Sequence, residues 1–124
     1  MYTVISHRSV RFVVLVTLCI LGTFALRSQA AAPSATVTIN NNSSWEIRAL
    51  YLSPVDNDNW GDDQLNGSAI APGSSYSLNL SWEQPTVKLI AEDADGCFIS
   101  TTVDATSNSS WAISSSSSRN CGSN

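Results

Sequence analysis

Residues 86–103, TVKLIAEDADGCFISTTV, decide the fold. Apolar and polar residues alternate in the first part of this stretch, so Val87 and Leu89 share one face of an extended chain and Lys88 lies on the other. The tetrapeptide Asp-Ala-Asp-Gly that ends at Gly96 is typical of a hairpin turn. Strand-forming residues resume directly after it. The stretch therefore predicts two antiparallel strands joined by a tight turn.

Further strand signals lie on both sides of this hairpin, and no window from residue 35 onward has apolar residues at helical spacing. The additional strands are expected at 35–40, 47–53, 68–70, 76–80 and 111–114. The segment 47–53 is apolar on both faces, which predicts a central strand, and the Pro72-Gly73 pair predicts a type II turn. Roughly six or seven short strands predict an all-β fold, a small antiparallel β-sandwich of immunoglobulin-like type, with a small barrel as the alternative.

The N-terminal segment has the pattern of an export signal. Residues 12–26 are uncharged, follow a basic stretch and lead into small residues. This pattern predicts a cleaved signal peptide over residues 1–30, cut after Ala30 or Ala32. An uncleaved anchor is the alternative, although Arg27 ends the apolar run early. The mature protein is therefore expected to be secreted or periplasmic and to meet the membrane only during export.

Two cysteines remain after this processing. Cys97 and Cys121 are expected to form a disulfide, because export places them in an oxidising compartment. The alternative is that Cys121 pairs between molecules. The β-sandwich domain is expected to span residues 31–113, and the Ser- and Asn-rich tail 114–124 is too polar to bury, so that only the disulfide would hold it down.

Charge and composition exclude several functions. The expected mature chain has three cationic side chains against ten carboxylates, a formal net charge of −7. Nucleic-acid binding is excluded, because it depends on Lys and Arg that displace counterions from phosphates. The single histidine, His7, lies in the signal segment, so the mature chain lacks an imidazole for general-base chemistry. No catalytic residues are predicted, and the protein is not expected to be an enzyme.

An acidic loop between two of the expected strands is the main candidate site. It carries four carboxylates at Asp56, Asp58, Asp62 and Asp63. Such clustered oxygens favour calcium, with Asp93 and Asp95 as possible contributors. An EF-hand is rejected, because its fifth position would be Trp60 and its twelfth Gly67. The alternative is a solvated loop whose acids cap backbone amides while Trp60 covers the end of the sandwich.

Two tryptophans in expected loops, Trp60 and Trp82, are candidates for a ligand platform. Indole faces pack against the C–H faces of sugars, so these two side chains predict a carbohydrate-binding surface. The alternative is that Trp82 packs against Pro85, as large amphipathic rings usually find a partly buried position. Trp45 and Trp111 are expected to fill the core or the strand edges.

The acidic loop also carries a resemblance to a known family. Its residues LYLSP at 50–54, Asp58, Trp60-Gly61, Asp63 and Leu65, with the later turns Pro72-Gly73 and DADG at 93–96, are similar to a pattern LYxSP…DxWGxDxL…PG…DxDG. This pattern belongs to a family of small exported bacterial proteins. The resemblance covers residues 47–96. It implies a role for the acidic Trp loop, and the family has no established activity that would choose between folding and binding.

Three functions are therefore expected for an exported, non-catalytic domain with an unknown ligand or protein partner. The first is a calcium-dependent ligand-binding or adhesion module that uses the acidic loop. The second is a structural or protein-interaction domain without a metal. The third is a carbohydrate-binding module.

Overall fold

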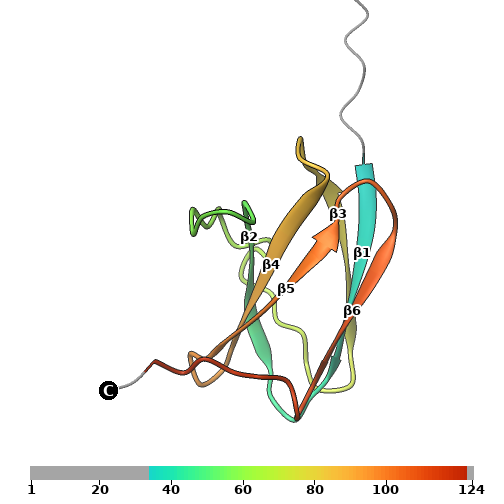
Figure 1. The fold of residues 1–124 in the computed structure, drawn as a ribbon. Helices are drawn as coiled ribbons and strands as arrows, with labels where there is room; N and C mark the ends of the chain where they lie inside the picture. The colour runs from blue at the N-terminus through green and yellow to red at the C-terminus, as the bar shows by residue number, and fades with distance from the viewer. Residues whose placement is uncertain (1–33, 123–124) are drawn as a thin grey trace, which may run out of the picture. The chain divides into compact units, whose positions relative to one another are not determined.

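The computed structural model describes residues 34–122, which form six strands (Figure 1). The strands are β1 Ser34–Asn42, β2 Ile47–Ser53, β3 Ser75–Ser81, β4 Thr86–Asp93, β5 Phe98–Asp104 and β6 Ser109–Ser114. This part of the chain has no helix, and hence none that is long and apolar enough to cross a membrane. The all-β prediction is confirmed. The expected signal peptide lies outside the described residues.

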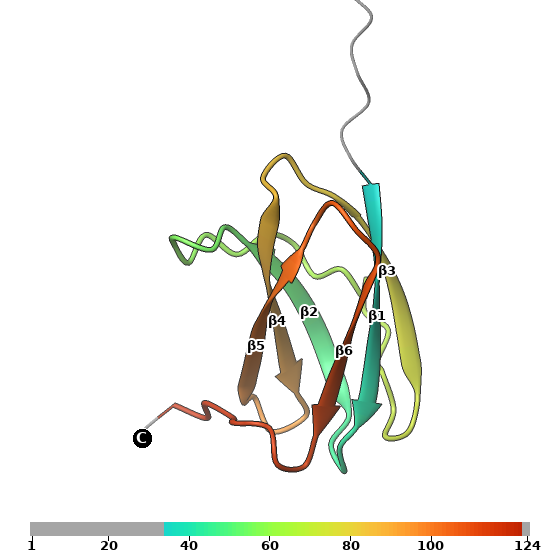
Figure 2. The same ribbon diagram turned by 45° about the vertical axis from the view of Figure 1, so that its right-hand side comes forward.

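The strands form two three-stranded sheets, in the orders β3-β1-β6 and β2-β4-β5 (Figure 2). Their apolar faces meet in one core, so the predicted small β-sandwich is confirmed. One pair departs from a purely antiparallel arrangement: β6 lies parallel to β1. The other three pairs are antiparallel. A parallel pair is possible here because β1 and β6 are distant in sequence and need no tight turn between them.

Alternation along the strands builds the core. In β1 the side chains of Ala35, Val37 and Ile39 are buried, while the residues between them are half-buried on the outer face. The same period of two buries Val87 and Leu89 of β4. Three tryptophans are partly buried against this core, at Trp45, Trp82 and Trp111.

Both predicted turns are present. Residues 93–96 join β4 to β5, and Gly96 has a φ of 76°, a value that L side chains rarely adopt. At the second turn Gly73 has a φ of 79°, and the N–H of Ser74 donates to the carbonyl of Ala71 at 3.0 Å. These values fit the type II geometry that the Pro72-Gly73 pair predicts.

Strand β2 is an edge strand, so its predicted central position is wrong. The long loop after β2 folds back along its free edge. Gly61 donates its N–H to the carbonyl of Leu52 at 3.0 Å, and Gln64 donates to the carbonyl of Leu50 at 2.7 Å. Ile47 then pairs with Ile70 in an isolated bridge. The strand is apolar on both faces because Leu50 packs into the core, while Tyr51 on the other face lies 5.5 Å from the ring of Trp60 in the loop.

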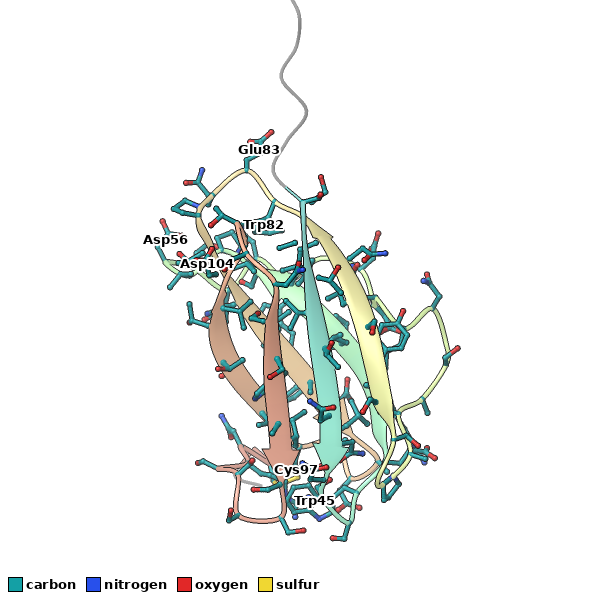
Figure 3. All side chains as sticks on the ribbon, turned by 90° about the vertical axis from the view of Figure 1, so that its right-hand side faces the viewer. Trp45, Asp56, Trp82, Glu83, Cys97 and Asp104 are labelled. Atoms are coloured by element: carbon teal, nitrogen blue, oxygen red, sulfur yellow. A yellow bond between two sulfur atoms is a disulfide. The ribbon has the colours of Figure 1, made fainter. Side chains whose placement is uncertain are left out.

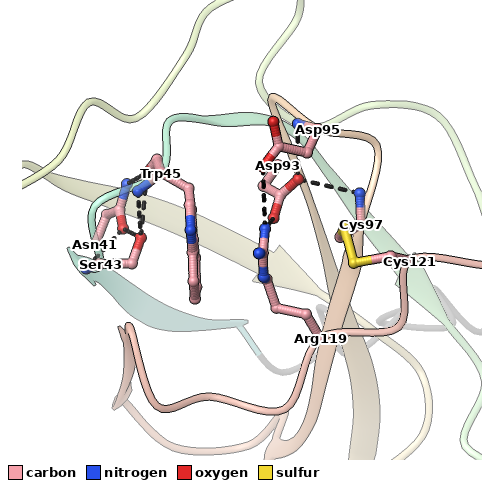
Figure 4. A network of polar contacts seen from close by, with 8 residues as sticks. All are labelled: Asn41, Ser43, Trp45, Asp93, Asp95, Cys97, Arg119 and Cys121. Carbon is pink, nitrogen blue, oxygen red and sulfur yellow. Dashed lines mark hydrogen bonds and ion pairs between the residues drawn. A yellow bond between two sulfur atoms is a disulfide. The ribbon is translucent and has the colours of Figure 1, made fainter.

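The C-terminal segment 115–122, here called the strap, is held by more than the expected disulfide. The Cys97–Cys121 disulfide is present within one chain. In addition, Phe98 and Asn120 exchange two backbone hydrogen bonds at 2.8 Å each. Arg119 contacts the side chains of Asp93, Asp95 and Trp45 (Figure 4). The serine-rich composition of the strap did not indicate these contacts, because composition is an average over the segment and the contacts are made by single residues.

Candidate functional site

A groove of about 170 Å³ lies on the outer face of the β2-β4-β5 sheet. Its floor comes from β4 and β5, one wall comes from the acidic loop and the other from the strap. The lining residues are Asp58, Trp60, Lys88, Ile90, Phe98, Ser100 and Asn120. The groove thus combines aromatic and aliphatic surface with a carboxylate, an ammonium, an amide and a hydroxyl, as small-molecule sites commonly do.

Trp60 is positioned by its own loop. The N–H of Gly61 bonds to β2 at Leu52, which brings the preceding indole onto the sheet. Its ring lies 5.5 Å from that of Tyr51 and 5.0 Å from that of Phe98, the second pair being edge-to-face. Even so, Trp60 keeps 40% of its surface exposed. It covers a sheet face, so the interpretation of Trp60 as a lid on the end of the sandwich was wrong.

Asp58 and Lys88 form an ion pair at the mouth of the groove. The ammonium of Lys88 donates to Asp58 Oδ1 at 2.8 Å. This hydrogen bond holds the pKa of Asp58 below its usual value, and the carboxylate therefore stays ionised well below neutral pH. The Asp58 side chain is 83% exposed and that of Lys88 is 21% exposed, so a ligand in the groove has access to both charges.

Asp63, in the same loop, accepts hydrogen bonds from backbone N–H groups. One of its oxygens accepts the N–H groups of Leu50 and Leu65 at 3.0 and 2.9 Å, and the other accepts that of Gly67 at 3.2 Å. Partial burial raises the pKa of Asp63, but these three donors outweigh it and leave the pKa below its usual value. Asp63 therefore ties the loop to the free edge of β2.

The four carboxylates proposed as calcium ligands are used separately. Asp58 bonds to Lys88 and Asp63 to backbone amides, while Asp56 and Asp62 are exposed. Asp93, a possible contributor, bonds to Arg119. Within residues 34–122 no three side chains of His, Cys, Asp or Glu come together as a metal site. The calcium site stays a prediction, and these contacts do not favour it.

Replacing Asp63 by alanine is expected to lower the free energy of unfolding by about 1–3 kcal/mol, because it leaves three backbone N–H groups without their acceptor. Asp62→Ala is the matched control on the neighbouring exposed residue, with an expected change of about 0.5 kcal/mol or less. Urea titration of both variants measures this difference. If millimolar calcium raised the melting temperature and Asp62→Ala removed the increase, the calcium-site hypothesis would be supported and the solvated-loop interpretation rejected.

Trp82 does not join Trp60. It lies near Glu83, at the end of the sandwich opposite Trp45 (Figure 3). There it lines a separate hollow of about 250 Å³ with Ser81, Glu83 and Gln84. Its indole N–H is buried and has no hydrogen-bond partner among residues 34–122. The two tryptophans predicted as one ligand platform are therefore parts of two different surfaces.

A second polar cluster joins the strap to the β4–β5 turn (Figure 4). Asp93 is 1% exposed and accepts the guanidinium of Arg119 at 2.7 Å. The same carboxylate accepts the N–H groups of Asp95 and Cys97 at 2.9 and 3.0 Å. Burial raises the pKa of Asp93, but its hydrogen bonds to Arg119 and to the two amides leave it below the usual value. On its other side, Arg119 lies 3.9 Å from the ring centre of Trp45.

Several residues of the groove were missed from the sequence. Phe98 and Asn120 line the groove because the strap pairs with the start of β5. This pairing joins two residues that are far apart in the sequence. Lys88 carried a usable signal, since the alternation in β4 placed it on the outer face. Nothing local indicated that the loop would bring Asp58 to it. The groove therefore depends on tertiary pairing more than on a motif.

Comparison with known protein families, curated proteins and solved structures finds no match for this chain. The resemblance of residues 47–96 to a family of exported proteins stays a prediction. A functional proposal accordingly rests on the chemistry of the groove.

Proposed function

We propose that this protein is an exported, non-catalytic domain that binds a carbohydrate in the Trp60 groove. The observation that carries the proposal is the exposed indole of Trp60, which is fixed by Tyr51 and Phe98 beside groups that can hydrogen-bond a ligand. The other tryptophans are partly buried against the core. A large aromatic side chain that is held rigid and left exposed loses little conformational entropy when it binds.

The groove suits the two-sided chemistry of a sugar ring. The C–H face of the ring packs on an indole, and its hydroxyls both donate and accept hydrogen bonds. Asp58 accepts, Lys88 donates, and Asn120 and Ser100 can each do both. These groups surround the aromatic surface at the floor and both walls. These polar groups would orient the ligand, and Trp60 and Phe98 would provide most of the contact area.

The charges of the groove support binding without cleavage. Glycoside hydrolysis ordinarily requires two carboxyl groups on either side of the bond, one of them protonated. Among the described residues that line the groove, Asp58 is the only carboxyl group, and Lys88 lowers its pKa. A carboxylate kept ionised in this way is a good hydrogen-bond acceptor and a poor general acid.

Export is part of the same proposal. The signal pattern of residues 1–30 supports it, and the Cys97–Cys121 disulfide is typical of an oxidising compartment. A secreted or periplasmic location would bring the groove into contact with polysaccharides.

Calorimetric titration of the exported protein with maltose, cellobiose, xylobiose and chitobiose tests the proposal. At least one disaccharide is expected to bind with a dissociation constant in the micromolar to millimolar range, and Trp60→Ala to weaken it about tenfold or more, because the stacking surface is lost. Val55→Ala is the matched control, since Val55 is 47% exposed on the same loop but lies outside the groove. Equal affinity of wild type and Trp60→Ala for the disaccharide would show that it binds outside the Trp60 groove. If no disaccharide of the panel bound, the protein-interaction alternative would be favoured.

A further inference from the structure

The β3-β1-β6 sheet carries no charged side chain. None of the residues of β1, β3 or β6 is Asp, Glu, Lys, Arg or His. From residue 34 onward the chain has ten carboxylates and three cationic side chains, and all of them lie on the other sheet, the loops and the strap. The outer surface of the neutral sheet consists of Thr, Asn, Ser and Ala side chains. This sheet is therefore where two copies of an acidic protein repel each other least.

Both edges of the neutral sheet are open. The N–H of Asn41 donates to the carbonyl of Ser74, and from this pair onward hydrogen-bonded and non-hydrogen-bonded pairs alternate along β1 and β3. Ser77, Asn79 and Ser81 fall in the non-hydrogen-bonded pairs, so their backbone N–H and C=O groups point away from β1. These outward groups have no backbone partner within residues 34–122. Along β6, the described backbone bonds outside its ladder are both at the last residue: the N–H of Ser114 donates to the hydroxyl of Ser117, and the carbonyl of Ser114 accepts the N–H of Ser117.

The edges of the other sheet are treated differently. The free edge of β2 is covered by its own loop through the carboxylate of Asp63 and backbone bonds. The free edge of β5 is bridged at Phe98 by the strap and ends in the charged Asp104. Edge strands in monomeric proteins are usually blunted by such covers or by Lys and Pro. β3 and β6 contain neither Lys nor Pro.

We propose that a second copy of this chain occupies these edges, with β6 of one copy pairing with β3 of the next. Within one copy β1 is antiparallel to β3 and parallel to β6, so β3 and β6 run in opposite directions. Copies placed side by side in the same orientation therefore bring β6 and the neighbouring β3 together as an antiparallel pair. Each copy keeps one open edge for another, so the assembly extends without closing. One strand pair gives a weak contact, which salt strengthens by screening the net negative charge.

Sedimentation velocity of the exported protein over a range of concentrations tests this proposal. In high salt at millimolar protein we expect a continuous series of dimers, trimers and larger species, which shortens in low salt. Asn79→Pro removes one outward donor on β3, whereas Asn79→Ala keeps that N–H and is the matched control. Asn79→Pro is expected to weaken association at least tenfold, and Asn79→Ala to leave it within twofold. A wild type that stays monomeric under these conditions overturns the proposal.

Mixing separates this arrangement from symmetric alternatives. Asn79→Pro retains an intact β6 edge, so small amounts added to wild type are expected to cap growing assemblies and shorten them. A series that stops at the dimer would show pairing of identical edges and reject the β6-to-β3 contact, as would equal losses for Asn79→Pro and Asn79→Ala. Thermal melts of each variant establish that it is folded, and Ser81→Pro at the end of the same edge replaces Asn79→Pro if that variant does not fold.

Discussion

Replacing Asp93 by alanine is expected to lower the free energy of unfolding by about 3 kcal/mol, a large fraction of the stability of a small domain. The carboxylate is buried and is the shared acceptor for Arg119, Cys97 and Asp95. Its removal leaves two amide N–H groups and a half-buried guanidinium without their partner, and desolvated groups are costly when unpaired. Urea or guanidinium titration of wild type and variant measures the difference.

Asp95→Asn is the control for this prediction. Asp95 contacts the same guanidinium at 3.3 Å, but its side chain is 66% exposed. We expect its replacement to change the free energy of unfolding by about 0.5 kcal/mol or less, since exposed ion pairs contribute little. Equal effects for the two variants would show that burial of Asp93 adds nothing, and would contradict the account of the cluster given above.

The pH dependence of stability provides a second measurement on Asp93. Its pKa in the folded protein lies below the ordinary value, so its contribution is fully present above about pH 4 and is lost as the pH falls through the folded pKa. Below about pH 4 the melting temperature of wild type is therefore expected to fall more steeply than that of Asp93→Ala. Parallel curves for the two proteins would exclude this carboxylate as a source of acid sensitivity.

Breaking the Cys97–Cys121 disulfide is expected to cost about 3–4 kcal/mol, because it closes a loop with a sequence separation of 24 residues and its loss frees the unfolded chain. A Cys97→Ala/Cys121→Ser double variant avoids leaving a free thiol. Its denaturant midpoint is expected to be lower than that of wild type.

Reductant provides the matched control for the disulfide. Wild type in reductant is expected to approach the midpoint of the double variant, whereas the variant itself is expected not to respond. A loss of less than about 1 kcal/mol would show that Arg119 and Asn120 hold the strap without the covalent link. A response of the variant to reductant would show that the effect comes from another source.

The fold was largely predictable from alternation and turn chemistry. The period of two in 86–92 and 35–40 and the turn at Gly96 are local signals, and each corresponds to an element of the structure. The position of β2 within its sheet was not predictable in this way. A segment that is apolar on both faces can be covered by neighbouring strands or by a loop, and the local sequence does not distinguish these two cases.

The candidate site was predicted only in its separate parts. The sequence pointed to Trp60 and to the acidic residues around it, but it assigned Asp58 and Asp63 a common role as metal ligands. In the structure Asp58 bonds to a lysine on β4, and Asp63 bonds to amides of β2 and of its own loop. Two carboxylates of identical chemistry thus acquire different functions from their partners: Asp58 from a lysine 30 residues away, and Asp63 from amides of β2 and of its own loop.

The order in which the groove is built has a consequence for how the protein matures. Asn120, which forms one wall, follows all six strands in the chain and reaches Phe98 only when the strap has returned across β5. A polypeptide that emerges from a translocation channel with its N-terminal end first would assemble both sheets before this wall exists. If the proposed export and ligand binding are correct, ligand affinity would appear late, after Asn120 and Cys121 have cleared the channel and Cys121 has been oxidised.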